Sequence, residues 1–278
     1  MYLTLLVVTN PVLASNNRGE NEGNLQTLQK VRTREGMRTV LSGYAIKRAI
    51  RDAMQANGAK MWRRSVDPDQ VNRAGYIYGE NDSPTLAGAE PKAPEGYDDV
   101  VFGYMSAPKG KAEDAVKRAG CVEVSAALST TPYDGDMAFV QGLKAATPDL
   151  APFSHERHYT RYQFTLTMNL GDLAGQPTSL PYLLDSLRFL RVGGSHASNA
   201  SELSPAVLAW RFHKAPGRGG LHLGAGLDFL PDESVDLTPL RTRCVDLGLD
   251  LNVAGQGADM TIAKALDAIK ERAEGLSC

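Results

Sequence analysis

A short region near the N-terminus combines residue types that bind a phosphate backbone. After an apolar strand comes a polar stretch over residues 16–24, which contains Asn17, Arg18 and Asn24 and is followed by Gln26. Amide and guanidinium side chains, with exposed backbone amides, donate hydrogen bonds to phosphate and sugar oxygens. A stretch so polar and so rich in Gly and Asn cannot bury itself, so we expect it to be a loop.

A basic run follows the loop and leads to a predicted helix from Leu41 to Met54. Positive side chains placed in succession beside exposed amides indicate a surface that attracts anions. The members of the run are Lys30, Arg32, Arg34 and Arg38.

The start of the predicted helix is suited to an anion. Ser42 is a good N-cap, and Ser42 and Gly43 would expose free amides at the positive end of the helix dipole. Lys47, Arg48 and Arg51 lie beside one another because residues three and four apart are neighbours on a helix, and we expect them to face solvent. Loop, run and helix together predict a groove for a nucleic-acid backbone. An ordinary solvated basic surface is the alternative.

Charge is distributed unevenly along the 278 residues. The net charge of −2 excludes a uniformly basic nucleic-acid binder, but residues 18–73 carry a net +6 and residues 74–278 a net −8. A chain of this kind can present one positive face and stay acidic elsewhere. The first apolar run, residues 3–8, is too short to span a bilayer, so we expect a cytoplasmic protein.

The predicted elements follow the order strand, helix, strand, strand, helix, strand, with insertions and a C-terminal helix. That order is typical of an α+β, ferredoxin-like or RRM-like sandwich. The aromatic signature by which an RRM binds single strands is absent, because Phe164, although it alternates with Tyr162 on a predicted strand, is expected in the core.

Residues that could support catalysis are scattered. The run from His155 to His158 does not have the spacing of a zinc motif, and the Ser195–His196 pair lacks a nucleophile elbow. The three cysteines form no C-x-x-C pair, which disfavours a disulfide framework and a structural zinc site. We therefore expect no metal and no cofactor.

Several segments, in the right order, resemble the backbone subunit of type I CRISPR Cascade complexes, of the DevR kind. The most specific are Asn17-Arg18-Gly19-x-x-x-Gly23-Asn24, Gly36-Met37-Arg38 and the run from Leu41 to Arg51. Further matching segments are residues 102–105, 121–129, 159–170 and 193–199.

The resemblance implies a single RRM-like palm over residues 1–278. Its fingers insertion would follow the first helix at about 55–118, its thumb would lie between the second and third strands at about 131–158, and a C-terminal helix would span about 260–273. It also implies a non-catalytic protein whose copies assemble head-to-tail along a CRISPR RNA and present the spacer to target DNA. The implied partners are that RNA, the target strand, further copies, and the large, small and repeat-end-binding subunits.

The resemblance implies RNA contacts from the first loop, the basic run, the helix start, the thumb and a glycine-rich segment. Relatives usually carry Gln where this chain has Tyr44. The implied residues are Asn17, Arg18, Asn24, Gln26, Lys30, Arg38, Ser42, Gly43, Tyr44, Lys47, Arg48, Arg51, Met137, Phe139, Gly193, Gly194 and His196.

The alternative is an enzyme, a ferredoxin-like CRISPR RNA endonuclease. His155 or His196 would then act as general acid or base, the role that histidine most often fills in catalysis.

Overall fold

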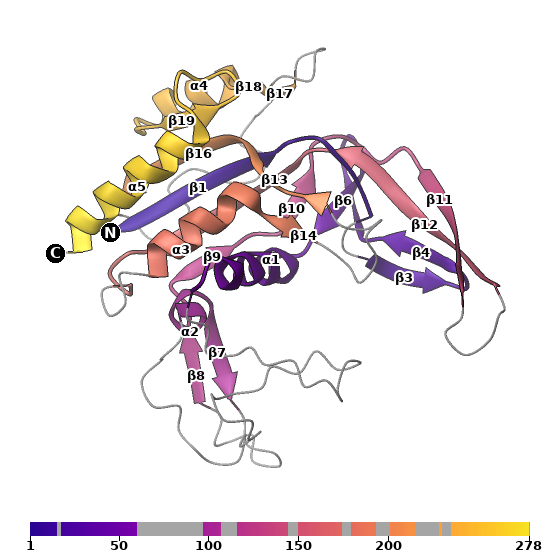
Figure 1. Cartoon of the computed structure of the whole chain (residues 1–278). Coiled ribbons are helices and arrows are strands. Elements are labelled where there is room, and N and C mark those ends of the chain that lie inside the picture. Colours follow the sequence, from indigo (N-terminus) through magenta and orange to yellow (C-terminus); the bar gives the residue numbers. More distant parts are fainter. Residues whose placement is uncertain are drawn as a thin grey trace.

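The computed structural model describes residues 1–15, 18–59, 97–106, 116–143, 150–173, 179–192, 201–214, 228–229 and 235–277. These residues form a mixed α+β fold whose sheets are mainly antiparallel (Figure 1). Among them, no helix is long and apolar enough to cross a membrane.

The main sheet is eight-stranded, and the buried strand that opens the chain lies in its interior. In spatial order its strands are β19 (Asn252–Gly255), β16 (Pro205–His213), β1 (Tyr2–Thr9), β13 (Tyr162–Asn169), β10 (Ala127–Ser129), β6 (Gly36–Leu41) and β5 (Lys30–Thr33), with β9 (Val122–Val124) also paired to β13. Every neighbouring pair is antiparallel.

Helices cover both faces of this sheet. They are α1 (Gly43–Ala56), α2 (Tyr97–Phe102), α3 (Ser179–Ser186) with its 3-10 extension η3 (Leu187–Phe189), α4 (Thr238–Asp246) and α5 (Ile262–Ser277). Leu3, Leu5 and Val7 of β1 pack in the cluster that contains the buried residues of α1, α3 and α5. Leu6 points the other way, because side chains alternate along a strand, and it packs on Leu240 of α4.

A second sheet stands beside the first and is built from distant parts of the chain. Its strands are β11 (Asp136–Leu143), β12 (Leu150–Thr160), β4 (Leu25–Leu28) and β3 (Arg18–Glu22), with β2 (Val12–Ala14) also paired to β12. β4 runs parallel to β12, with Leu25 beside Ser154 and Gln26 beside His155. Three two-stranded ribbons complete the described elements: β14 (Arg191–Val192) with β15 (Ser201–Glu202), β17 (Asp228–Phe229) with β18 (Val235–Asp236), and β7 (Gly103–Ser106) with β8 (Val116–Ala119).

The predicted loop over residues 16–24 is wrong where the structure describes it. Residues 18–22 are strand β3, which turns at Gly23 and pairs with β4. This polar segment is a strand because β4, which is itself paired to β12, supplies backbone partners that its own composition does not reveal. The matching segment over residues 121–129 contains two strands, β9 and β10. Ser125 lies between them and has a structural role, because its Oγ accepts a hydrogen bond from Thr165 N at 2.9 Å.

Candidate nucleic-acid interface

The start of α1 is organised as predicted. Ser42 is the N-cap, and its Oγ accepts a hydrogen bond from Ala45 N at 3.2 Å. The first amides of a helix have no acceptor within it, so they are available to an anion. Tyr44 projects from this first turn with 84% of its surface exposed.

Gly43 lets the helix start lie close to the chain that follows β9. A Cβ added at this position would lie 2.6 Å from the Val124 carbonyl oxygen and 3.3 Å from that of Ser125. Both obstacles are backbone atoms, so a side chain here would displace the helix start from the sheet. Gly43 is therefore needed for close approach.

The basic residues of α1 divide into two kinds, and the expectation that all three face solvent is wrong. Arg51 has only 18% of its side chain exposed, and its Nε lies 3.8 Å from Oδ2 of the buried Asp98. Its guanidinium carbon also lies 4.7 Å from the centre of the Phe102 ring. Arg51 thus fastens α1 to α2.

Lys47 and Arg48 are more available to a ligand than Arg51. Lys47 is half-buried beside Phe102, and burial, followed by the charge of Arg51, lowers the pKa of its ammonium group. Arg48 is exposed, and its Nε lies 3.2 Å from Oδ2 of Asp52, one turn along the helix. Exposed pairs of this type contribute little to stability, so Arg48 could exchange Asp52 for a phosphate.

The basic run forms the hairpin β5–β6, and two of its cations have acidic partners. The Lys30 Nζ lies 2.6 Å from each carboxylate oxygen of Glu156. Arg38 donates to the carbonyl of Ser129 at 2.7 Å and forms an ion pair with Glu35. These two side chains are held by the protein. Arg32 and Arg34, in the same hairpin, are exposed.

Two predicted residues lie beside the second sheet. Asn24 is exposed in the turn between β3 and β4, and its carbonyl accepts a hydrogen bond from Ser154 N at 3.0 Å. Gln26 lies on β4, and its Oε1 is buried without a hydrogen-bond partner among the described residues. Arg18 lies on β3. Asn17, Gly193, Gly194 and His196 fall outside the residues that the structure describes.

Met137 and Phe139 are exposed on β11, at 60% and 66% of their surface. They are two residues apart on a strand and therefore share a face. They stand opposite Glu156 and Ser154 of β12. β11 and β12 extend away from the main sheet (Figure 1).

A buried polar cluster at the base of β12 was missed by sequence reasoning. His158 contacts the Thr39 hydroxyl at 2.9 Å through Nδ1 and the Pro132 carbonyl at 3.2 Å through Nε2. The Thr39 hydroxyl also lies 2.9 Å from that of Tyr162. Burial lowers the pKa of His158, although the bond to Pro132 opposes this shift. The two histidines in the 155–158 run were a signal, but Thr39, the partner of His158 Nδ1, lies 119 residues away in the sequence.

The histidines of this run are poorly placed to meet a substrate. His155 has 2% of its surface exposed, and both ring nitrogens of His158 have protein partners. Among the described residues, no group of three or more His, Cys, Asp or Glu side chains could hold a metal ion.

The face that binds RNA in an RRM is also different here. Tyr162 and Phe164 are fully buried in the helix-side core, which confirms the expectation for Phe164. The opposite face of β13 carries Gln163, Thr165 and Thr167, and these side chains are also buried. This strand therefore presents no exposed ring to a base.

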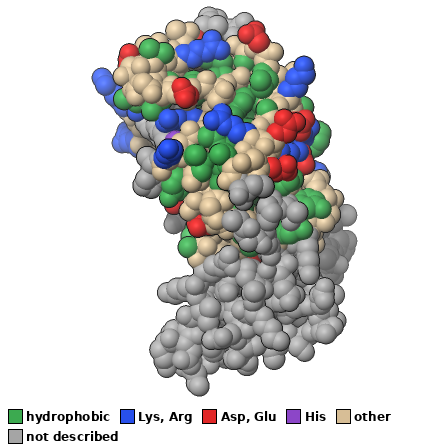
Figure 2. Space-filling view, turned by 90° about the vertical axis from the view of Figure 1, so that its left-hand side faces the viewer, with side chains coloured by type: hydrophobic (Ala, Val, Ile, Leu, Met, Phe, Trp, Pro, Cys, Tyr) green, Lys and Arg blue, Asp and Glu red, His purple; other side chains and the backbone are tan. Residues whose placement is uncertain are grey.

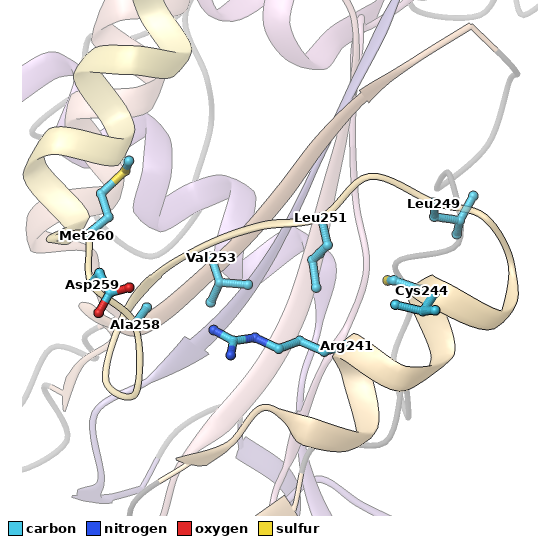
Figure 3. A pocket seen from close by; sticks show the side chains of 9 residues that line it. Arg241, Cys244, Leu249, Leu251, Val253, Ala258, Asp259 and Met260 are labelled. Atoms are coloured by element: carbon cyan, nitrogen blue, oxygen red, sulfur yellow. The ribbon is translucent and has the colours of Figure 1, made fainter.

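A pocket of about 500 Å³ lies between α4, β19 and the start of α5 (Figure 3). None of the predicted site residues that the structure describes lines it. Its walls are largely apolar but include Arg241 and Asp259; the lining residues are Arg241, Cys244, Val245, Leu249, Leu251, Val253, Ala258, Asp259 and Met260.

On the side of the molecule that carries the C-terminus, Figure 2 shows acidic, basic and hydrophobic side chains intermixed. Such mixing is typical of an ordinary solvated surface.

Comparison with known proteins identifies the family. A family model described as "CRISPR-associated negative auto-regulator DevR/Csa2" matches residues 9–209. The chain belongs to the DevR/Csa2 family. One family relative, "CRISPR-associated protein Cas7/Cst2/DevR" from Myxococcus xanthus (strain DK1622), is 30% identical in an alignment of 214 positions that covers 71% of this chain and 67% of the relative. The α1 surface lies within the matched residues, whereas α4 and its pocket lie beyond them.

Solved structures support the fold of this DevR/Csa2 chain. It superposes on a chain of "CRISPR RNA-guided surveillance complex, pre-nicking" with a TM-score of 0.62 at 14% identity, covering 98% of this chain and all of the other. A chain of a second structure, "CRISPR RNA-guided surveillance complex", gives a TM-score of 0.57 at 15% identity with the same coverage. At these identities the likeness concerns the fold alone.

Proposed function

We propose that this chain is a non-catalytic backbone subunit of a type I CRISPR Cascade complex. Its copies would assemble head-to-tail along one CRISPR RNA, hold the RNA backbone, and leave the bases available to a target DNA strand. The large, small and repeat-end-binding subunits would complete the complex. The observation that carries the proposal is the capped start of α1, with exposed Tyr44 and Arg48 and half-buried Lys47, in a chain of the DevR/Csa2 family.

The strand order supports an RRM-like palm. β1, β9/β10, β13 and β16 occur in the chain order of the four strands of such a fold, α1 and α3 lie in the two crossovers, and the spatial order β16–β1–β13–β10 is antiparallel throughout. Within this interpretation, the fingers are the insertion at about 55–118, which includes α2 and β7, and the thumb is the insertion at about 131–158.

The second sheet supports a thumb that is held firmly at its base. β11 and β12 make up most of the 131–158 insertion, and β12 is joined to the segment before α1 through β2, β4 and the Lys30–Glu156 pair. Met137 and Phe139 on β11 would then reach the RNA as the thumb crosses it.

The division of the basic residues refines which side chains hold RNA. Lys47 and Arg48 are the two cations of α1 that we assign to phosphates, together with the amides after Ser42. Arg51, Lys30 and Arg38 act instead through the protein, by fixing α2 and the hairpin β5–β6 in place. This revises the role that the resemblance implies for these three.

Chromatography of the purified chain tests the proposal. With a CRISPR RNA added, we expect a high-mass peak with a raised ratio of absorbance at 260 nm to that at 280 nm, which RNase collapses. The double variant Lys47→Gln/Arg48→Gln should remain monomeric under the same conditions. A matched control, Arg241→Gln/Lys264→Gln, removes two exposed cations elsewhere and should assemble as the wild type does. Assembly by the first double variant would show that RNA is held at another surface.

A cleavage assay addresses the enzymatic alternative. We expect the wild-type chain to leave CRISPR RNA intact with and without divalent metal ions. Cleavage by the wild type that is lost in His155→Ala or His196→Ala would instead support an endonuclease.

A further inference from the structure

Phe189 is an exposed aromatic side chain that the core does not use. It ends the 3-10 turn η3 with 78% of its surface exposed, whereas Leu187 and Leu190 on either side are buried. Leaving a phenyl ring in water forgoes the free energy of burying it, and the ring has no polar group that water could bind. Its exposure therefore indicates a ring available to a partner.

Phe189 belongs to the part of the molecule that carries the proposed RNA surface. η3 and the following strand β14 both contact α1, the helix that carries Tyr44 in its first turn. In Figure 1, β14 lies beside the end of α1 that follows β6. Exposed Phe189 and Tyr44 thus come from two elements in contact.

A series of contacting elements leads from β14 to a third exposed ring. β14 pairs with β15, β15 contacts β2, and β2 pairs with β12. On that last pair, Tyr159 stands directly opposite Leu13, and both are exposed. A path of contacting elements therefore connects Tyr44 and Phe189 to Tyr159 and onward to β11.

Single-stranded nucleic acid is the partner that this arrangement fits. Proteins that hold single strands without sequence preference combine cations that follow the backbone with aromatic rings on which bases stack. Lys47 and Arg48 supply the cations on α1, and the exposed rings accompany them. A phenyl ring reads no hydrogen-bonding edge, so it accepts any base, as a protein that carries guides of differing sequence requires.

We propose that Phe189 stacks on a base of the bound RNA, next to Tyr44. This rests on the proposed function and adds a residue that holds a base to those that hold phosphates. Because stacking needs a flat ring, Phe189→Tyr should keep it, whereas Phe189→Leu should lose it while retaining an apolar side chain of similar size.

The experiment measures the affinity of the purified chain for two fluorescent single-stranded RNAs of one length. One carries ordinary bases, and the other has abasic sites through its centre. For the RNA with bases, we expect Phe189→Leu to bind about five- to a hundredfold more weakly than wild type and Phe189→Tyr to bind within about twofold of it. For the abasic RNA, all three proteins should bind alike. Val245→Ala, which truncates an exposed side chain on α4, is the control and should match wild type throughout.

Each other outcome contradicts the inference in a recognisable way. If Phe189→Leu binds RNA as tightly as the wild type does, the stacking role is overturned and the proposed function stays in place. No RNA binding by the wild type would overturn both. If Phe189→Leu binds a short RNA normally but fails to assemble on a long one, Phe189 contacts a neighbouring copy and not a base.

Discussion

The Lys30 ammonium lies 2.6 Å from both carboxylate oxygens of Glu156, and the same carboxylate accepts a hydrogen bond from Leu28 N at 2.7 Å. The Lys30 Nζ also lies 4.5 Å from the centre of the Tyr133 ring. One carboxylate thereby joins β12 to β5 and to the residue that ends β4. Burial raises the pKa of Glu156, but the bonds from Lys30 and Leu28 outweigh it and hold that pKa below its usual range.

Glu156→Gln should destabilise the fold by about 2 kcal/mol, because a charge-assisted hydrogen bond becomes a neutral one beside a partly buried ammonium group. Urea unfolding followed by circular dichroism measures the change. Glu35→Gln is the control: Glu35 is exposed beside Arg38, so its loss should cost less than about 1 kcal/mol. Equal stability of Glu156→Gln and wild type would show that the second sheet does not depend on this pair.

Arg51→Ala should destabilise the chain by about 3 kcal/mol, since it leaves the buried Asp98 carboxylate without its guanidinium neighbour. Arg48→Ala breaks an exposed pair with Asp52 and should cost less than about 1 kcal/mol. Thermal unfolding of the two variants compares them directly. Greater loss in Arg48→Ala would contradict the assignment of Arg51 to the α1–α2 contact.

Stability should fall as the pH is lowered from about 7 to 5, in part because of His158. Its folded-state pKa lies below the ordinary value near 6.5, so the unfolded chain takes up the proton first and gains free energy relative to the folded state. Glu156, with its lowered pKa, contributes stability above the ordinary pKa of a glutamate, and this is lost only at more acidic pH. Urea midpoints at pH 7 and 5 should differ less in His158→Gln than in wild type. An unchanged difference would exclude His158 as a source.

The salt dependence of RNA binding should report on Lys47 and Arg48. Each phosphate neutralised on a single strand contributes about −0.7 to the slope of log affinity against log salt concentration, so Lys47→Gln/Arg48→Gln should make the slope about 1.4 shallower. Fluorescence anisotropy at several potassium chloride concentrations gives the slope. An unchanged slope in the double variant would mean that neither cation neutralises a phosphate.

Two substitutions at Ser42 distinguish its role in capping the helix from its role in binding RNA. Ser42→Ala removes the acceptor for Ala45 N and should cost about 1 kcal/mol of stability. Ser42→Asp keeps an acceptor there and should remain as stable as wild type, yet bind RNA more weakly because a carboxylate repels phosphate. Parallel thermal unfolding and RNA titration distinguish the effects. RNA affinity unchanged in Ser42→Asp would remove the helix start from the interface.

Local pattern predicted the parts of the fold whose signals are local. Residues 2–9 and 162–169 read as strands from their β-branched and alternating residues, and the cap at Ser42 identified the helix start. Strands β3 to β6 were not predicted, because polar residues interrupt their apolar pattern and several of their partner strands are distant in the sequence. A sequence shows which residues are basic, but it does not show that Arg51 has Asp98 beside it, or Lys30 Glu156.

The same limit applies to the candidate site. Ser42, Gly43 and Arg48 lie on the first two turns of α1 and could be inferred from residue type and spacing, whereas Tyr44 was implied by the family resemblance. Phe189 could not, because its exposure depends on η3 ending between two buried leucines. Burial in the core is the ordinary expectation for a phenylalanine.

The parallel pairing of β4 with β12 has a consequence for biosynthesis. Leu28 and Glu156, which bond across this junction, are separated by 128 positions. At a translation rate of about 5–20 residues per second, roughly 6–26 seconds pass between the synthesis of β4 and the synthesis of its partner strand β12. During that interval one edge of the β3–β4 hairpin is open to pairing with other chains. β4 has only four residues, and β3 beside it carries Arg18, Glu20 and Glu22. A short edge strand next to charged residues is a poor template for pairing while the rest of the protein is synthesised.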